Sequence, residues 1–202
     1  MDISDRGFSY LKNQKLDMRF SEKTKLNAEY ILNNYSEEDL SDIFYRYGEE
    51  RWSARIARSI INFRHVKKLE STGELVEIIK RTIPAKYRYR GHPAKKIFQA
   101  IRIEVNSELE NLKKALEESL GVLRPGGRIV IISYHSLEDR IVKTTFEKFS
   151  GRCICPPKLP VCSCGAITVG KIITRRAVRP SGDEVKENPR SKSAKLRAFE
   201  KI

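Results

Sequence analysis

The stretch LRPGGRIVIISYHSLEDRIVK, residues 123–143, decides the fold of this chain. It opens with Pro-Gly-Gly at 125–127, a turn that ends any preceding helix. Four apolar residues follow at 129–132 without a break, as in a strand buried on both faces. Polar residues then occupy positions 133–140. Because ligands in open α/β sheets bind beyond the carboxyl ends of the strands, we expect a functional site there.

Lysine and arginine dominate the charge of the chain. Its 202 residues include 40 of them against 26 aspartates and glutamates, a net charge of +14. Fourteen basic residues and three glutamates lie in 51–102, and six basic residues with no acid lie in 152–180. Two such blocks favour a nucleic acid as partner. No apolar run reaches the roughly 18 residues of a membrane span, so we expect a cytoplasmic protein without a membrane partner. The alternative interpretation of the two basic blocks is a charged surface that only keeps the protein in solution.

Helices are predicted for the first half of the chain and strands for the second. Ser36 is an expected helix cap, and Ser71 forms an expected capping box with Glu74. Apolar residues recur at helical spacing from 93 to 120, which predicts one long helix. The later elements are expected as a helix over 137–149, strands over 171–178 and 194–202, and a turn over 180–188.

The polar run after the strand supplies the expected catalytic groups. We interpret Ser133, His135, Ser136 and Asp139 as residues that position a substrate and polarise a nucleophile. A structural interpretation stays open, because Ser136 and Asp139 also resemble a helix capping box. The sequence contains no G-x-S-x-G motif, so the run does not resemble the nucleophile elbow of a serine hydrolase.

A short cationic and aromatic segment, residues 86–90, has a composition suited to phosphates and stacked bases. An ordinary charged loop is the alternative interpretation. The residues expected to contact nucleic acid are Lys86, Tyr87, Arg88, Tyr89 and Arg90, together with Arg175 and Arg176 on the strand expected over 171–178.

The four cysteines form two Cys-x-Cys pairs within twelve residues, namely Cys153, Cys155, Cys162 and Cys164. One small loop can therefore present four thiolates to a zinc ion. The spacing is tighter than the usual C-x₂₋₄-C of zinc sites, so unligated thiols in a surface loop are the alternative. Stable disulfides are not expected in a cytoplasmic protein.

Eight stretches of the chain, in order, resemble one known family. They are RGFSY, LDMR, YSEEDL, YGEERWSARIARSI, TGELVEII, HPAKKIFQAIRIEVNSELENL, LRPGGRIVIISYHSLEDRIVK and NPRSKSAKLRAFEK. They resemble the bacterial 16S ribosomal RNA cytosine-N4 methyltransferases, the RsmH or MraW family. The resemblance covers essentially the whole chain.

This resemblance implies an α/β fold, the C-terminal half of a class I S-adenosylmethionine methyltransferase (Rossmann-like) interrupted by an all-helical insert. Residues 1–100 would hold the insert and its entry segment, and 101–202 the C-terminal part of the catalytic domain. The implied reaction is S-adenosylmethionine-dependent methylation of cytidine N4 in the decoding centre of the small ribosomal subunit. The family's glycine-rich cofactor loop would lie upstream of Met1, so we expect a truncated chain, inactive alone. The alternatives are a non-catalytic RNA-binding module, which a zinc ion could stabilise, and a helical DNA-binding protein.

Overall fold

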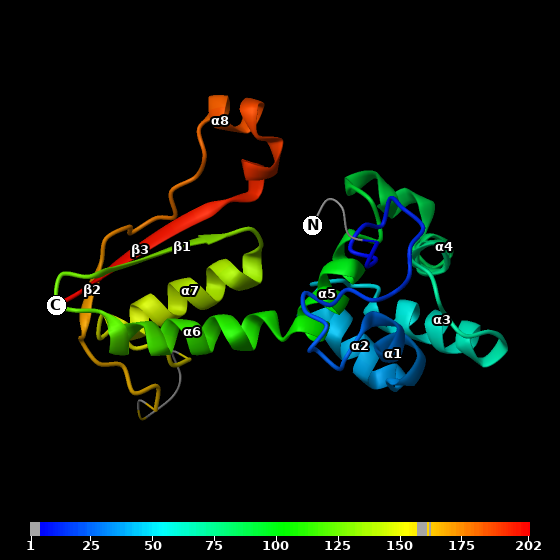
Figure 1. Ribbon diagram of the computed structural model, residues 1–202, viewed down its shortest axis with the longest axis horizontal. Coiled ribbons are helices and arrows are strands. Elements are labelled where there is room, and N and C mark those ends of the chain that lie inside the picture. The colour runs from blue at the N-terminus through cyan, green and yellow to red at the C-terminus, as the bar shows by residue number, and fades with distance from the viewer. Residues whose placement is uncertain (1–4, 157–160, 162) are drawn as a thin grey trace. The chain divides into compact units, whose positions relative to one another are not determined.

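The computed structural model describes residues 5–156, 161 and 163–202, and it divides the chain into two compact units. Unit 1 ends at Glu108 and unit 2 extends from Leu109 to Ile202, whereas the sequence places the boundary after residue 100. Unit 1 is helical (Figure 1) and contains α1 (Ala28–Asn34), α2 (Glu37–Arg46), α3 (Ser53–Val66), α4 (Thr72–Thr82), the 3₁₀ helix η1 (Ala85–Arg90) and α5 (Lys95–Asn106). Unit 2 contains most of α6 (Glu108–Val122), then β1 (Arg128–Ser133), α7 (Ser136–Phe149), β2 (Gly170–Ile172), α8 (Gly182–Glu187), η2 (Pro189–Ser193) and β3 (Lys195–Lys201).

The helix caps predicted in unit 1 are confirmed. The Ser36 hydroxyl accepts the Asp39 amide while the Asp39 carboxylate accepts the Ser36 amide, and α2 begins there. Ser71 and Glu74 make the same reciprocal pair at the start of α4. Each capping box satisfies two amides that the helix itself leaves without partners. The apolar faces of these helices meet in a core that includes Leu40, Phe44, Ile56, Ile60, Leu75 and Ile79, all fully buried.

The single long helix expected over 93–120 is wrong. Ser107 adopts a left-handed conformation with φ 48°, so α5 ends at Asn106 and α6 begins at Glu108. The side-chain amide of Asn106 stabilises this break, because its Nδ2 donates to the backbone carbonyls of Met18 and Arg102, at 2.8 and 2.9 Å. The apolar stripe continues across the break, which is why the periodicity does not reveal it.

Unit 2 is built on a three-stranded antiparallel sheet in the order β1-β3-β2. The chain enters β1 through the predicted turn, where Gly126 has φ +80° and the Gly127 amide donates to Arg124 O at 2.9 Å. A proline followed by a residue with positive φ is the pattern of a type II turn. Helices α6 and α7 lie along one face of the sheet (Figure 1), and the core there consists of Leu116, Ile129, Val142, Phe146, Phe149 and Phe199.

The expectation that β1 is buried on both faces is wrong within the described structure. Ile129 points into the core, but Val130 and Ile132 on the opposite face are each 53% exposed. The reason is that both covering helices lie on one side of a sheet with only three strands. On the open face, Glu200 of β3 pairs with Arg128 at 2.8 Å and Lys171 at 2.7 Å, which links all three strands.

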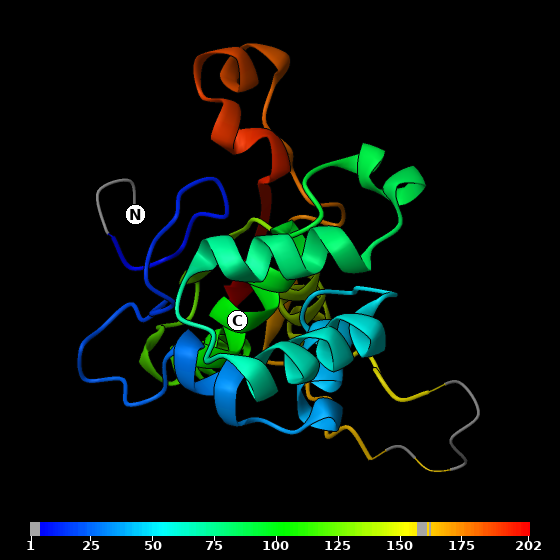
Figure 2. The ribbon, with the colours of Figure 1, turned by 90° about the vertical axis from the view of Figure 1, so that its right-hand side faces the viewer.

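The last elements differ in part from expectation. The strand expected over 171–178 is much shorter, because β2 covers only Gly170–Ile172 and a single bridge joins Val178 to Leu196. A side chain at position 170 would collide with the Phe199 ring, so glycine is required at this start of β2, where it pairs with β3. The turn expected over 180–188 contains the short helix α8, which with η2 extends beyond the sheet in both views (Figures 1 and 2). The strand expected over 194–202 is confirmed as β3.

Candidate functional site

The predicted site lies where β1 leads into α7. His135 has extended backbone angles and caps α7, with its Nδ1 accepting the Glu138 amide at 3.4 Å. The Glu138 carboxylate in return accepts the amides of Tyr134 at 2.8 Å and His135 at 3.3 Å. The capping box expected from Ser136 and Asp139 is therefore wrong by one residue. Ser136 is instead the first, exposed residue of the helix.

The charge at this cap is held on Glu138. Burial favours a higher pKa for this carboxyl, but the His135 side chain and the two backbone amides outweigh it and lower the pKa below its ordinary value. Glu138 is therefore ionised at neutral pH. Its Oε1 also lies 3.3 Å from His135 Nε2. Because Nδ1 accepts an amide proton, the neutral imidazole carries its own proton on Nε2, next to this carboxylate.

Ser133 ends β1 with an unusual hydroxyl. The residue is only 2% exposed, and within the described structure its Oγ has no hydrogen-bond partner. A buried hydroxyl without a partner costs about 1–3 kcal/mol, so such groups are rare unless a ligand or another segment satisfies them. Two of the predicted catalytic residues, Ser133 and His135, thus have a buried polar atom, Oγ and Nε2 respectively, without a hydrogen-bond partner among the described residues.

Asp139 is engaged within unit 2. Its Oδ1 accepts from Arg197 Nε at 2.7 Å and its Oδ2 from Lys195 Nζ at 3.0 Å, both on β3. Burial favours a higher pKa for Asp139, but the hydrogen bonds from the two cations lower it below its ordinary value. The carboxylate therefore stays ionised and ties α7 to the last strand. This arrangement suits a positioning residue more than a group that takes up a proton.

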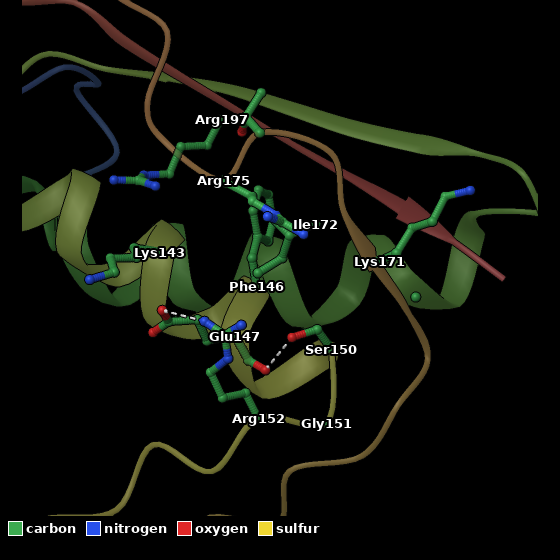
Figure 3. A pocket seen from close by; sticks show the side chains of 12 residues that line it. Lys143, Phe146, Glu147, Ser150, Gly151, Arg152, Lys171, Ile172, Arg175 and Arg197 are labelled. Carbon is green, nitrogen blue, oxygen red and sulfur yellow. Dashed lines mark hydrogen bonds and ion pairs between the residues drawn. The ribbon is translucent and has the colours of Figure 1, made fainter.

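A cavity of about 710 Å³ lies beside the ion-pair triad of Asp139, Lys195 and Arg197, between α7 and the segment around β2, and Arg197 is one of its lining residues. Five basic side chains line it, with Glu147 as the acidic lining residue (Figure 3): Lys143, Arg152, Lys171, Arg175 and Arg197. Arg152 pairs with Glu147 at 3.5 Å and Lys171 with Glu200, whereas Lys143 and Arg175 have no ion-pair partner among the described residues. The predicted Arg175 therefore lies in a cationic cavity. The predicted Arg176 is exposed but does not line it.

Unit 1 carries a second basic surface, the aromatic–cation cluster of Arg51, Trp52, Arg55, Lys86 and Tyr87. The Arg51 guanidinium lies 4.1 Å from the centre of the Tyr87 ring, and the centres of the Trp52 and Tyr87 rings lie 5.5 Å apart. Arg55 covers Trp52 at 5.3 Å, and Lys86 lies 5.2 Å from the Tyr87 ring. Among the described residues these three cations have no ion-pair partner. The cluster thus presents unneutralised charge next to aromatic rings.

The sequence predicted two of the five residues of this cluster. It named Lys86 and Tyr87 as nucleic-acid contacts but not Arg51, Trp52 and Arg55, which lie around the start of α3, more than thirty positions earlier in the chain. The run Arg51-Trp52-Ser53-Ala54-Arg55 does show cations flanking the single tryptophan, and this was the available signal. The part-buried Arg88 side chain bonds within unit 1, because its Nε donates to Ile83 O at 2.8 Å. The side chains of Tyr89 and Arg90 lie outside the described part.

The described thiols converge. The sulfur atoms of Cys153, Cys155 and Cys164 all lie within 4.8 Å of one another, and those of Cys153 and Cys164 are 3.9 Å apart. Cys162 lies outside the described residues. The described helices include none that is long and apolar enough to cross a membrane.

Comparison with known proteins identifies the family. The sequence profile of the MraW methylase family matches residues 1–202. The chain belongs to the MraW methylase family. This family has the S-adenosylmethionine-dependent methyltransferase fold, so the helices and small antiparallel sheet described above are those of an α/β methyltransferase. The resemblance seen in the eight sequence stretches is thereby confirmed.

Curated relatives agree over the whole chain. A Ribosomal RNA small subunit methyltransferase H of Clostridium botulinum is 52% identical over 202 residues, and the protein of that name from Symbiobacterium thermophilum is also 52% identical. The one from Clostridioides difficile is 49% identical over 203 aligned residues. All of this chain is matched, but it spans only 64–65% of the length of these relatives.

Proposed function

We propose that the chain is part of an S-adenosylmethionine-dependent enzyme that methylates the N4 amine of a cytidine in 16S ribosomal RNA, acting in the cytoplasm on the decoding centre. Its relatives are named as ribosomal RNA small subunit methyltransferases, and the match extends over every residue. The structural observation that supports this reaction most is the buried Ser133 hydroxyl at the end of β1, which has no described partner.

The chemistry of the amine explains why such a group is useful. The nitrogen lone pair of cytosine N4 is delocalised into the ring, so the amine is a poor nucleophile. A fixed acceptor that hydrogen bonds to one N–H can orient the amine and favour the localised lone pair. Ser133 Oγ is such an acceptor. His135 and Ser136, the next polar residues of the same turn, would fix the base around it, and the target cytidine must leave its stack to reach them.

Asp139 contributes to this proposal as a positioning residue. Its bonds to Arg197 and Lys195 hold the first turn of α7 against β3 and thereby fix the turn that carries Ser133 and His135. The cofactor supplies the methyl group when bound. The described residues contain no glycine-rich loop between a strand and a following helix, the feature that commonly holds a nucleotide. We therefore assign no residue of this chain to the cofactor.

RNA binding is assigned to two basic sites, one on each unit. The aromatic–cation cluster offers three cations and two rings to phosphates and unstacked bases. The cationic cavity offers Lys143 and Arg175 to the phosphate backbone, and exposed Arg176 follows directly in the chain. Segment 86–90 contributes through Lys86 and Tyr87, and we retain Arg88, Tyr89 and Arg90 as predicted contacts. Zinc enters only as a structural ion of the cysteine loop, with no part in methyl transfer.

The second candidate function is a non-catalytic RNA-binding module, which the two basic sites favour on their own. Analysis of the reaction product distinguishes the methyltransferase from the non-catalytic module. A version of the chain extended to the full length of its relatives, with labelled S-adenosylmethionine and small-subunit RNA, should yield N4-methylcytidine in nucleosides analysed by mass spectrometry. RNA that is bound but gains no methyl group would support the module. A methyl group on a ring carbon or ring nitrogen would contradict the proposed chemistry.

The RNA contacts are tested by the salt dependence of binding. Each phosphate neutralised on a single strand contributes roughly −0.7 to the log–log slope. Replacing Arg51, Arg55 and Lys86 with alanine should therefore flatten the slope by about 2 if all three reach phosphates. Arg46→Ala is the matched control, because this arginine pairs with Asp42 at 2.9 Å and lies outside the cluster. An unchanged slope in the triple variant would reduce the cluster to a solvated surface.

A further inference from the structure

We infer that the thiolates of Cys153, Cys155 and Cys164 bind a structural zinc ion, which closes the segment between α7 and β2. The sulfurs already lie at metal-binding distances from one another. A tetrahedral zinc with Zn–S bonds of about 2.3 Å places neighbouring sulfurs about 3.8 Å apart. The distance between Cys153 and Cys164 is 3.9 Å, and no pair among the three exceeds 4.8 Å.

The electrostatics of the cluster point the same way. As neutral thiols, Cys164 and Cys153 can share an S–H···S hydrogen bond at their 3.9 Å separation. As the thiolates that bind metals, the three sulfurs would repel one another, and a cation between them removes that repulsion. The Ser163 amide donates to Cys155 Sγ at 3.4 Å, which is the kind of outer contact that orients a sulfur ligand and stabilises its anionic form. Sulfur donors select zinc over magnesium or calcium, which prefer oxygen. The three described ligands leave a fourth position to water or to a further ligand.

The position of the cluster indicates what the metal does. Residues 150 and 168 form an antiparallel bridge, and the Val169 amide donates to Phe149 O at 2.9 Å, so the base of the segment is already closed. Beyond this base, the described parts of the segment extend away from α7 in both views (Figures 1 and 2). The cysteines are exposed or half-buried rather than packed in a core. A metal would therefore supply the order that apolar burial does not.

The ion would also fix one wall of the cationic cavity. Gly151 and Arg152, which line that cavity, directly precede Cys153 (Figure 3). Removing the metal should therefore weaken RNA binding as well as loosen the loop. This consequence rests on the proposed RNA-binding function, but the metal content is measured without RNA, so the two claims can fail separately.

Zinc content and cobalt spectroscopy test the site. The chain purified under reducing conditions should retain one zinc per molecule after gel filtration, measured by plasma mass spectrometry. Cobalt added after chelation should give the intense visible bands of a tetrahedral thiolate site and a sulfur-to-cobalt charge-transfer band. Cys153→Ser and Cys164→Ser should each lose both signals. Ser163→Ala, in the same loop, keeps its backbone donor and should retain them.

Limited proteolysis tests the structural role. Trypsin can cut after Arg152, which is exposed. Chelation should raise that cleavage rate roughly tenfold or more, because a ligand that binds the ordered state protects it. Far-UV circular dichroism of each variant shows whether the rest of the chain remains folded. A metal-free protein without cobalt–thiolate bands, or a Cys153–Cys164 disulfide in the reduced preparation, would overturn the inference.

Discussion

Replacing Asp139 with asparagine tests the ion-pair triad that joins α7 to β3. The side chains of Asp139 and Arg197 are 14% and 12% exposed and that of Lys195 is 28% exposed, so the pair lies mostly out of water. Asparagine keeps one oxygen for Arg197 but turns an amide toward Lys195. Breaking a largely buried pair on one side leaves a cation uncompensated, and we expect a loss of about 3 kcal/mol in the free energy of unfolding of unit 2.

The assay has to report on unit 2. The single tryptophan, Trp52, belongs to unit 1, so its fluorescence reports the wrong unit. Amide hydrogen exchange of a peptide that spans β3, followed across a urea series, reports unit 2 directly. With a slope of about 1.5 kcal/mol/M, the expected loss moves the urea midpoint down by about 2 M.

The matched control is Asp183→Asn. Asp183 pairs with Lys186 at 2.9 Å, but these side chains are 86% and 79% exposed, so the loss should be under about 0.5 kcal/mol. The difference between Asp139→Asn and the parent should also shrink in acid. A carboxyl with a lowered folded-state pKa stabilises above its ordinary value of 3.8, and this contribution is lost as the pH falls. If both variants lose equally little, the triad does not stabilise unit 2 and the positioning role fails.

Two further predictions concern the cap of α4 and the cofactor. The Lys67 ammonium and the amides of residues 70 and 71 lower the pKa of Glu74 to about 2. Its stabilisation is therefore present above pH 4.5 and lost toward pH 2, so Glu74→Gln should flatten the acid limb of thermal stability. An unchanged pH profile would contradict this. The 202-residue chain alone should bind S-adenosylmethionine poorly, because its sequence has no glycine-rich loop after a strand. A micromolar dissociation constant in titration calorimetry, about −8 kcal/mol, would contradict that expectation.

Local signals in the sequence predicted the elements that local interactions determine. The helix caps at Ser36 and Ser71, the Pro-Gly-Gly turn and the start of α7 all depend on neighbours within four residues. The apolar run of β1 predicted a strand, but not its partner β3, which lies more than 60 positions later in the chain. The break at Ser107 could not be predicted in this way. It depends on Asn106 bonding to Met18 O, 88 positions earlier in the chain.

The candidate site shows the same division. The sequence located the polar turn after β1 but not the roles within it. His135 rather than Ser136 caps α7, because the strand runs to Ser133 and the helix starts one residue earlier than the pattern implied. The partners of Asp139 lie 56 and 58 positions away on β3, and no spacing rule connects them.

The proposed catalysis is tested most directly at Ser133. In a full-length version, Ser133→Ala removes one oxygen from a buried position and should leave the fold intact, because that oxygen has no described partner to lose. We expect single-turnover methylation of small-subunit RNA to fall by about 10²-fold, as for loss of one fixed hydrogen-bonding group, while RNA affinity stays within about twofold. A methylation rate equal to that of the parent, or equal losses of rate and affinity, would contradict a catalytic role for the end of β1.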